Sequence, residues 1–130
     1  MYDIVVGVDT DVDRALAQAE AIAELPGREE VRAILLHVVR GSADGAIEDV
    51  ESVTEARTEL AAANVEVTTE TAEGDPAMCI LDAAERHDAN CICVAGRDRS
   101  PTGKAIFGSV TQDVVVGAKR PTLVCSASKQ

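Results

Sequence analysis

The chain has 130 residues, a length that favours one domain over residues 1–130. It is 46% hydrophobic but only 2% aromatic, so its core must be aliphatic, which is typical of parallel strands covered by helices. The net charge of −11 disfavours binding to nucleic acid or anionic lipid, and no apolar run approaches the roughly 20 residues of a membrane-spanning helix.

Two buried strands flank a helix at the start of the chain. The apolar run DIVVGV predicts a strand over 3–8 that is covered on both faces. Asp11 and Asp13 are candidate N-caps for a helix that ends near Leu25, with Ala, Leu and Ile side chains along one stripe. The run VRAILLHVV predicts a second buried strand over 31–39.

A second helix and a more polar strand follow. Apolar side chains at helical spacing predict a helix over about 47–63, with Asn64 at the position of a C-cap. The alternating run VEVTTETA predicts a strand over 65–72, and its polar character favours the edge of a sheet. Asp75 as N-cap and Pro76 at the first helical position then begin the helix with the clearest signal in the chain.

The last part of the chain continues the alternation around a glycine-rich loop. The run CICVAG predicts a buried strand over 91–96. Ser109 and Gln112 form a candidate capping box for a short helix that ends near Gly117, and TLVCS predicts a final strand over 122–126.

This order of strands and helices indicates an α/β fold. Strands that alternate with helices of this length predict a parallel sheet with helices on both faces, joined by right-handed crossovers. The chain shows no internal repeat, linker or low-complexity segment, so a single domain is expected. Its first residues lack the basic region of a signal peptide, and a cytoplasmic protein is expected.

The sulfur and imidazole side chains form no pattern that predicts a metal site or a catalytic base. The four cysteines lack C-x-x-C spacing and are interpreted as small buried hydrophobes: Cys79, Cys91, Cys93 and Cys125. His37 lies inside a buried strand, and His87 lies near a helix C-terminus, where a cation suits the helix dipole. We therefore expect that the protein is not an enzyme.

The glycine-rich stretch GRDRSPTGKAIFGS, from Gly96 to Ser109, does not match two common phosphate-binding motifs. A Walker A loop has four residues between its glycines and a hydroxyl after its lysine, but here six residues intervene and Ala105 follows Lys104. The dinucleotide motif G-x-G-x-x-G fails because no two glycines are separated by one residue.

A simpler anion site remains at the end of this stretch. Gly108 and Ser109 open a helix whose first N–H groups can bind an anion, and Arg97, Arg99 and Lys104 place positive charge in the same loop. The alternative is that Ser109 only caps its helix and that the basic side chains are solvated.

Asp9 and Gly96 are expected at the carboxyl ends of the first and fourth strands. If these strands are neighbours, the two residues face each other across the switch point where open α/β sheets bind ligands. The Asp9 carboxylate could then accept hydrogen bonds from a ribose or an adenine amine. The alternative is that Asp9 caps the first helix.

The order and spacing of these segments resemble the universal stress protein family along nearly the whole chain. YDIVVGVDTDVDRALAQA is similar to the family's first strand and helix, and ILLHVV to its second strand. EGDPAMCILDAAERHDANCICVAGR is similar to its third helix and fourth strand, and FGSVTQDVVVGAKRPTLVC to its last helix and strand.

The resemblance implies a Rossmann-like sheet of five parallel strands in the order 3-2-1-4-5, of the adenine nucleotide alpha hydrolase-like type. It also implies a homodimer formed through the last strand, residues 122–126, and a stress-response function with ATP or AMP, with or without Mg²⁺, bound between the first and fourth strands. Carried over from the family pattern G-x2-G-x9-G-[ST] and its flanking positions, the nucleotide-binding residues are Asp9, Val38, Gly96, Gly108, Ser109 and Val110.

The chain departs from the family pattern in the loop. Arg99 stands where the second glycine belongs, and eight residues instead of nine separate it from Gly108. Arginine side chains, with Arg97 beside Arg99, can hold phosphate where a glycine backbone would have done so. The alternatives are a signalling or interaction module of the same fold that binds no nucleotide, and an enzyme that slowly hydrolyses ATP.

The acidic surface suggests adaptation to salt. Only three lysines accompany nine arginines, against 23 acidic residues. Dense counterions screen the repulsion between surface carboxylates, so we expect a halophilic protein whose fold depends on salt.

Overall fold

The computed structural model describes residues 1–39, 50–96 and 108–126. Within these ranges the strands, in chain order, are β1 (Tyr2–Gly7), β2 (Val31–Val39), β3 (Glu66–Glu73), β4 (Cys91–Gly96) and β5 (Thr122–Ser126). The helices are α1 (Val12–Ala23), the short 3-10 helix η1 (Arg28–Glu30), α2 (Glu51–Ala62), α3 (Pro76–Arg86) and α4 (Ser109–Gly117).

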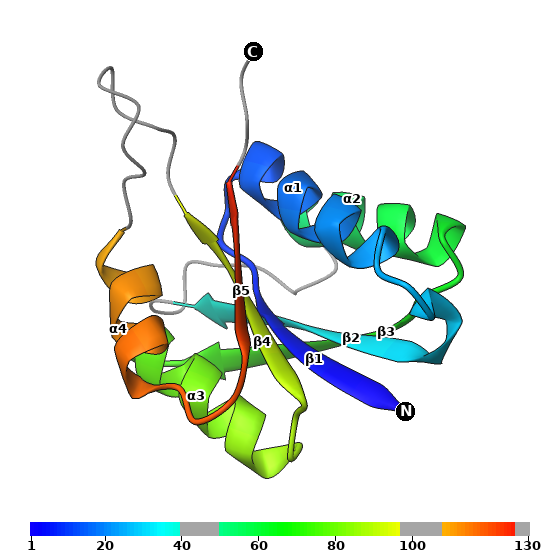
Figure 1. Ribbon diagram of the computed structural model, residues 1–130. Helices are drawn as coiled ribbons and strands as arrows, with labels where there is room; N and C mark the ends of the chain where they lie inside the picture. Colours follow the sequence, from blue (N-terminus) through cyan, green and yellow to red (C-terminus); the bar gives the residue numbers. More distant parts are fainter. Residues whose placement is uncertain (40–49, 97–107, 127–130) are drawn as a thin grey trace, which may run out of the picture.

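The strands form one parallel sheet in the order β3-β2-β1-β4-β5, which confirms the predicted α/β fold and strand order. Figure 1 shows α1 and α2 on one face of the sheet and α3 and α4 on the other. The predicted bounds of β2, β4 and β5 are exact, and those of β1 and β3 are shifted by one residue. The second helix was predicted to start near Ile47, which is wrong: Val50 has an extended backbone and is the N-cap, so α2 begins at Glu51.

Two aliphatic cores hold the helices against the sheet. Under α1 and α2, the core contains Ile4, Val6, Ile22, Leu35 and Leu60, all of them completely or almost completely buried. Under α3 and α4, a second core contains Val5, Ile34, Leu36, Ile80, Val94 and Val114. Alternate residues of β1 therefore serve opposite cores, as expected for a central strand covered on both faces.

Local signals in the sequence explain where the helices begin and end. The Asp11 carboxylate accepts the N–H of Arg14 at 2.9 Å and caps α1, and Asp75 accepts the N–H of Met78 at 3.0 Å and caps α3. Asn64 has a φ of 66° just after α2, which agrees with its predicted C-terminal capping position. In the described ranges no helix has both the length and the apolar character needed to cross a membrane.

A polar cluster joins the edge strand β3 to the end of α3. The Glu70 carboxylate accepts a hydrogen bond from Arg86 and another from Nε2 of His87 at 2.8 Å. His87 is the C-cap of α3, which agrees with its predicted place near a helix C-terminus. Burial raises the pKa of Glu70, but the hydrogen bonds from Arg86 and His87 outweigh burial and lower it below the ordinary value.

We expect Glu70→Gln to lower the free energy of unfolding by about 0.5–1 kcal/mol at pH 7. Because the folded pKa of Glu70 is lowered, its contribution is complete above the ordinary glutamate pKa of about 4.3 and is lost as the pH falls through the folded value. Urea unfolding of wild type and variant should therefore differ at pH 7, and the difference should shrink as the pH falls below the ordinary glutamate pKa. Glu66→Gln on the same strand is the control, because Glu66 is half exposed and lies 3.8 Å from Arg32.

Candidate functional site

A cleft of about 430 Å³ opens at the carboxyl ends of β1, β2 and β4. Here the strand order reverses: β1 connects through α1 to β2 on one side, and β4 lies on the other side of β1. The lining residues come from these strand ends and from the first turns of α3 and α4: Gly7, Val8, Asp9, Thr10, Leu36, His37, Val38, Pro76, Ile80, Val94, Ala95, Val110 and Thr111.

The cleft exists because β1 ends before its neighbour β2. The paired register of β1 with β2 stops at Gly7 and Leu36, and Val8 then donates its N–H to the Leu36 carbonyl at 2.9 Å. Backbone groups of a strand alternate in direction, so the N–H and carbonyl of Val38 point to the same side as those of Leu36. Val38 therefore directs its backbone toward the space beyond the end of β1.

Asp9 lies on the rim of the cleft in the loop between β1 and α1. One oxygen of its carboxylate accepts the N–H of Asp11 at 2.9 Å, and the other accepts Nε of Arg14 at 3.0 Å. Its backbone carbonyl accepts a hydrogen bond from the Ser52 hydroxyl at 2.5 Å, which ties the loop to α2. The side chain remains 52% exposed, so the carboxylate is oriented but open to a ligand.

His37 forms part of the cleft wall. It is 3% exposed, and its Nδ1 lies 2.9 Å from the Val8 carbonyl. A carbonyl oxygen only accepts hydrogen bonds, so Nδ1 carries the proton and donates it, and Nε2 of the neutral ring is an acceptor. The prediction that His37 is a buried strand residue is confirmed, and its bond to Val8 also fixes the backbone that leads to Asp9.

The helix N-termini at this end of the sheet differ in how they are capped. The first N–H groups of α1 and α3 are bound by the carboxylates of Asp11 and Asp75. The N-cap of α4 is Gly108, and within the described residues no side chain caps this helix. The amides of Ser109, Val110 and Thr111 precede the first intrahelical bond, which Gln112 donates to the Gly108 carbonyl at 3.0 Å. Amides that have no partner among the described residues, together with the helix dipole, favour an anion at this position.

Thr111 anchors the first turn of α4 to the end of β4. Its hydroxyl donates to the Ala95 carbonyl at 2.7 Å, and Thr111 is 4% exposed. This bond satisfies a carbonyl at the floor of the cleft and fixes the N-terminus of α4 beside it.

The structure brings together three of the residues predicted to bind a nucleotide. Asp9, Val38 and Val110 all line the cleft. Gly96 ends β4 one residue beyond the lining Ala95, and Gly108 and Ser109 begin α4 immediately before Val110. The two predicted arginines, Arg97 and Arg99, lie outside the described residues.

Two predictions about helix caps are wrong. Gly108, with φ −72° and ψ 166°, has the extended backbone of an N-cap, so the exposed Ser109 is the first helical residue and not the cap of a capping box. The alternative that Asp9 caps the first helix also fails, because Asp11 is the N-cap and Asp9 instead accepts the N–H of Asp11.

Sequence reasoning missed Arg14 and Thr111, and it did not place His37 in the cleft. Arg14 lies in the first turn of α1, where a side chain reaches back to the preceding loop, and this spacing could have suggested its pairing with Asp9. Thr111 carried no signal of its own, because its role depends on how α4 meets β4. Among the described residues no group of three or more His, Cys, Asp or Glu side chains could hold a metal ion.

Comparisons with known proteins agree with this architecture. A model of the universal stress protein family matches residues 1–126. A universal stress protein from Archaeoglobus fulgidus is 31% identical, with a TM-score of 0.77 over 96% of this chain and 98% of that chain. A structure of the Archaeoglobus fulgidus protein in complex with dAMP is 25% identical, with a TM-score of 0.72 and the same coverage.

A curated relative matches over a shorter segment. The stress response protein NhaX of Bacillus subtilis is 34% identical over 74 residues, which are 57% of this chain and 45% of NhaX. The match therefore spans less than half of that protein.

Proposed function

The chain belongs to the universal stress protein family, and from that premise we propose that it is a stress-response protein that binds an adenine nucleotide, ATP or AMP, in the cleft between β1 and β4. The observation that carries this proposal is the cleft itself. It has a hydrogen-bonding aspartate and a strand backbone at one side and an uncapped helix N-terminus at the other. Its volume falls within the range of about 300–1,000 Å³ that is usual for small-molecule sites.

The side of the cleft formed by β1 and β2 suits a nucleoside. Leu36, Val94 and Ile80 supply apolar walls for a base, and the backbone of Val38 can hydrogen-bond the edge of an adenine. Both Asp9 oxygens already accept one hydrogen bond, and each keeps another lone pair for a ribose hydroxyl or the adenine amine.

The opposite side of the cleft suits the phosphates. The free amides at the start of α4, including that of Val110, are the anion-binding groups of the site, with Gly96 and Gly108 on either side of the loop. We assign Arg97 and Arg99 the role of neutralising phosphate charge in place of the family's second glycine. Mg²⁺, if present, would be held by the phosphates, since the Asp9 carboxylate is paired with Arg14.

The relatives support the class of ligand. The Archaeoglobus fulgidus protein that resembles this chain over nearly its whole length is described in complex with dAMP. A universal stress family protein of Arabidopsis thaliana with AMP bound is 18% identical and shares the fold, with a TM-score of 0.71. An adenine monophosphate is therefore the first ligand to test.

We further propose a homodimer through β5. This strand ends the sheet order, so its outer edge is available to pair with a second copy. Apolar side chains on β5 and the neighbouring α4 are exposed, including Val124 at 38% and Val116 at 82%. Light scattering on the sample used for nucleotide titration gives the number of chains per particle and so the stoichiometry per site.

Calorimetric titration of AMP and of ATP with Mg²⁺ tests the proposed function. We expect micromolar binding of at least one nucleotide, and Asp9→Ala should weaken it by about 10- to 100-fold, because a hydrogen bond to a charged group is lost. Asp13→Ala is the matched control, since it removes the same charge from the exposed first turn of α1 without changing the cleft. The titration is run at moderate and high salt, because the acidic composition predicts that the fold is stabilised by salt.

The opposite result would be equally clear. Absence of binding heat at both salt concentrations, with no adenine nucleotide copurified and a circular dichroism spectrum of a folded protein, would contradict the proposal. The chain would then be assigned as a non-nucleotide interaction module of the same fold.

A further inference from the structure

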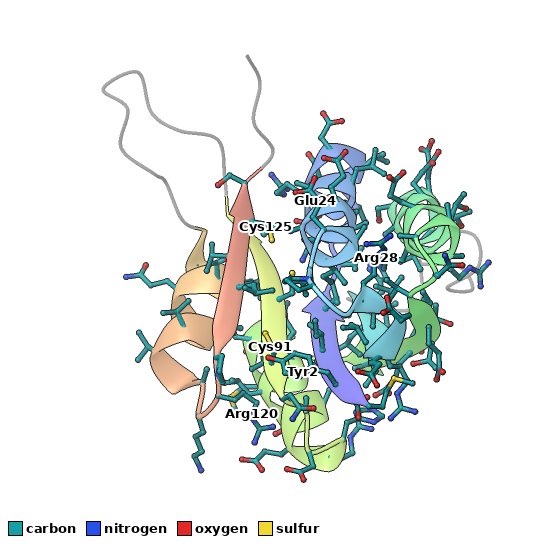
Figure 2. The ribbon with its side chains drawn as sticks, turned by 45° about the vertical axis from the view of Figure 1, so that its right-hand side comes forward. Tyr2, Glu24, Arg28, Cys91, Arg120 and Cys125 are labelled. Carbon is teal, nitrogen blue, oxygen red and sulfur yellow. The ribbon has the colours of Figure 1, made fainter. Side chains whose placement is uncertain are left out.

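Two cysteine sulfurs meet between β4 and β5 on the face of the sheet that α1 covers. Sγ of Cys93 and Sγ of Cys125 are 3.7 Å apart. The parallel register pairs Cys93 with Leu123 and Ala95 with Cys125, so the cysteines are diagonal neighbours whose side chains share a face. Figure 2 shows the sulfur of Cys125 on the side of β5 that faces α1.

The two thiols differ in their access to solvent. Cys93 is completely buried in the core under α1, where its sulfur lies 3.9 Å from Nε2 of Gln18. Cys125 is only half-buried, on the strand that ends the sheet order. A dissolved oxidant can therefore reach Cys125 before it reaches Cys93.

The hydrogen bond between the thiols also makes them chemically different. Either sulfur can donate in this contact, and with Cys93 as the donor the bond lowers the pKa of Cys125 below the ordinary thiol value despite partial burial. The same bond, together with burial, raises the pKa of Cys93, which keeps its proton. A half-exposed sulfur with a lowered pKa beside a buried thiol with a raised pKa is the arrangement of an attacking and a resolving cysteine.

The other two cysteines lack this arrangement. Cys91 is buried and its thiol donates to the Ile92 carbonyl at 3.5 Å, and burial raises its pKa. Cys79 is half-buried on α3 and donates to the Glu73 carbonyl at 3.6 Å. Burial and the nearby carboxylates of Asp82 and Asp75 raise the pKa of Cys79, so it is a matched control for exposure without activation.

We propose that Cys125 and Cys93 form a reversible thiol–disulfide pair that a hydroperoxide oxidises. The Cys125 thiolate attacks one oxygen of the hydroperoxide, the O–O bond breaks, and the departing alkoxide or hydroxide takes a proton to become an alcohol or water. Cys125 is then a sulfenic acid. The Cys93 sulfur attacks the Cys125 sulfur, the S–O bond breaks, and the hydroxyl leaves as water with the Cys93 proton. Two thiols are oxidised and one hydroperoxide is reduced, and a dithiol reverses the change.

Forming the bond requires a local shift of the backbone, because diagonal neighbours on paired strands lie about 7–8 Å apart. The sulfurs must approach from 3.7 Å to about 2.0 Å. Cys125 is the next-to-last residue of β5, so the strand end that carries it can shift while Thr122 and Leu123 stay paired with β4. The disulfide would link β4 to β5 and enclose the chain between them, which carries Ala95, Val110 and Thr111 of the cleft wall.

Treatment of the purified chain with hydrogen peroxide tests this pair. We expect an intact mass lower by about 2 Da, loss of two of the four alkylatable thiols, and a Cys93–Cys125 linked peptide after nonreducing digestion. Dithiothreitol should restore the original mass. The variant with both Cys79→Ser and Cys91→Ser should form the same link at the same rate, because those thiols take no part.

Single variants separate the two roles. Cys93→Ala should stop the reaction at a sulfenic acid on Cys125 that dimedone traps, whereas Cys125→Ser should leave Cys93 reduced. In wild type, iodoacetamide should label Cys125 about 10-fold faster than Cys79, and Cys93→Ala should slow the labelling of Cys125. The proposal is overturned if the mass does not change, if the link joins other cysteines or two chains, or if Cys79 is labelled as fast as Cys125.

Discussion

Replacing Gly7 with valine should destabilise the protein by about 1–3 kcal/mol and abolish nucleotide binding in the cleft. Gly7 ends β1 where α3 crosses it, and a Cβ on Gly7 would lie 2.6 Å from Cδ1 and 3.2 Å from Cγ1 of Ile80. Ile80 is 4% exposed and lines the cleft. When valine at position 7 displaces the Ile80 side chain, that side chain can move only into the cleft, where it would block the nucleotide. Urea unfolding measures the first effect and calorimetric titration with AMP measures the second.

Two further variants establish the cause. Ile80→Val removes Cδ1, so Gly7→Val should lower the free energy of unfolding less in that background than in wild type. The two effects are then non-additive, as expected for residues in contact. Gly117→Val is the control, because its Cβ would meet Cδ1 of Leu81 at 2.9 Å where α3 and α4 pack away from the cleft. Gly117→Val should lose stability and keep its affinity. Normal affinity in Gly7→Val would show that the Ile80 side chain does not close the site.

The sequence was sufficient for the fold because its signals are local and repeat regularly. Buried strands appear as continuous apolar runs such as the one that forms β1, and Asp75 with Pro76 marks the start of α3 unambiguously. The strand order came from the family resemblance, since local patterns do not say which strands are neighbours.

The site was only partly predictable, because local patterns do not say which residues of separate elements come into contact. Asp9 could be placed because it follows a strand end, whereas Val110 came from the family pattern that the chain resembles. The spacing of Arg14 from Asp9 could have suggested their pairing, but the bond of Thr111 to Ala95 depends on how α4 packs on β4, and no spacing rule encodes this. The contact between Cys93 and Cys125 also depends on the register of β4 with β5, which a one-residue shift would destroy.

Gln18 occupies a position in which an added charge should have a large and pH-dependent cost. Its side chain lies under the cleft, 1% exposed, and Nε2 donates to the Gly7 carbonyl at 2.9 Å and the Cys93 carbonyl at 3.4 Å. The amide thus joins the end of β1 to the middle of β4 from the α1 side. Gln18→Glu would replace this donor by a carboxyl group that faces two carbonyl oxygens.

We expect Gln18→Glu to lower the free energy of unfolding by about 3–4 kcal/mol at pH 7. Burial and the two carbonyls raise the pKa of the introduced carboxyl above its unfolded value of about 4.3, so the charge penalty is absent below that pH. The penalty then grows by up to about 1.4 kcal/mol per pH unit until the folded pKa is reached, and should be about 2–3 kcal/mol smaller at pH 5 than at pH 7. Urea unfolding at the two pH values measures the difference.

Gln18→Met separates the lost hydrogen bonds from the added charge. Methionine has a similar length and no charge, so it leaves the Gly7 and Cys93 carbonyls without their donor at a cost of about 1–3 kcal/mol that does not change between pH 5 and pH 7. If Gln18→Glu lost the same stability at both pH values, the introduced carboxyl would have reached water and the amide would not be held between the strands. If the loss in free energy of unfolding rises with pH for Gln18→Glu and not for Gln18→Met, the side chain at this position is shielded from water. The two carbonyls beneath the cleft then require a hydrogen-bond donor. Any ligand between β1 and β4 would then bind above a contact that this side chain adds to the pairing of the two strands.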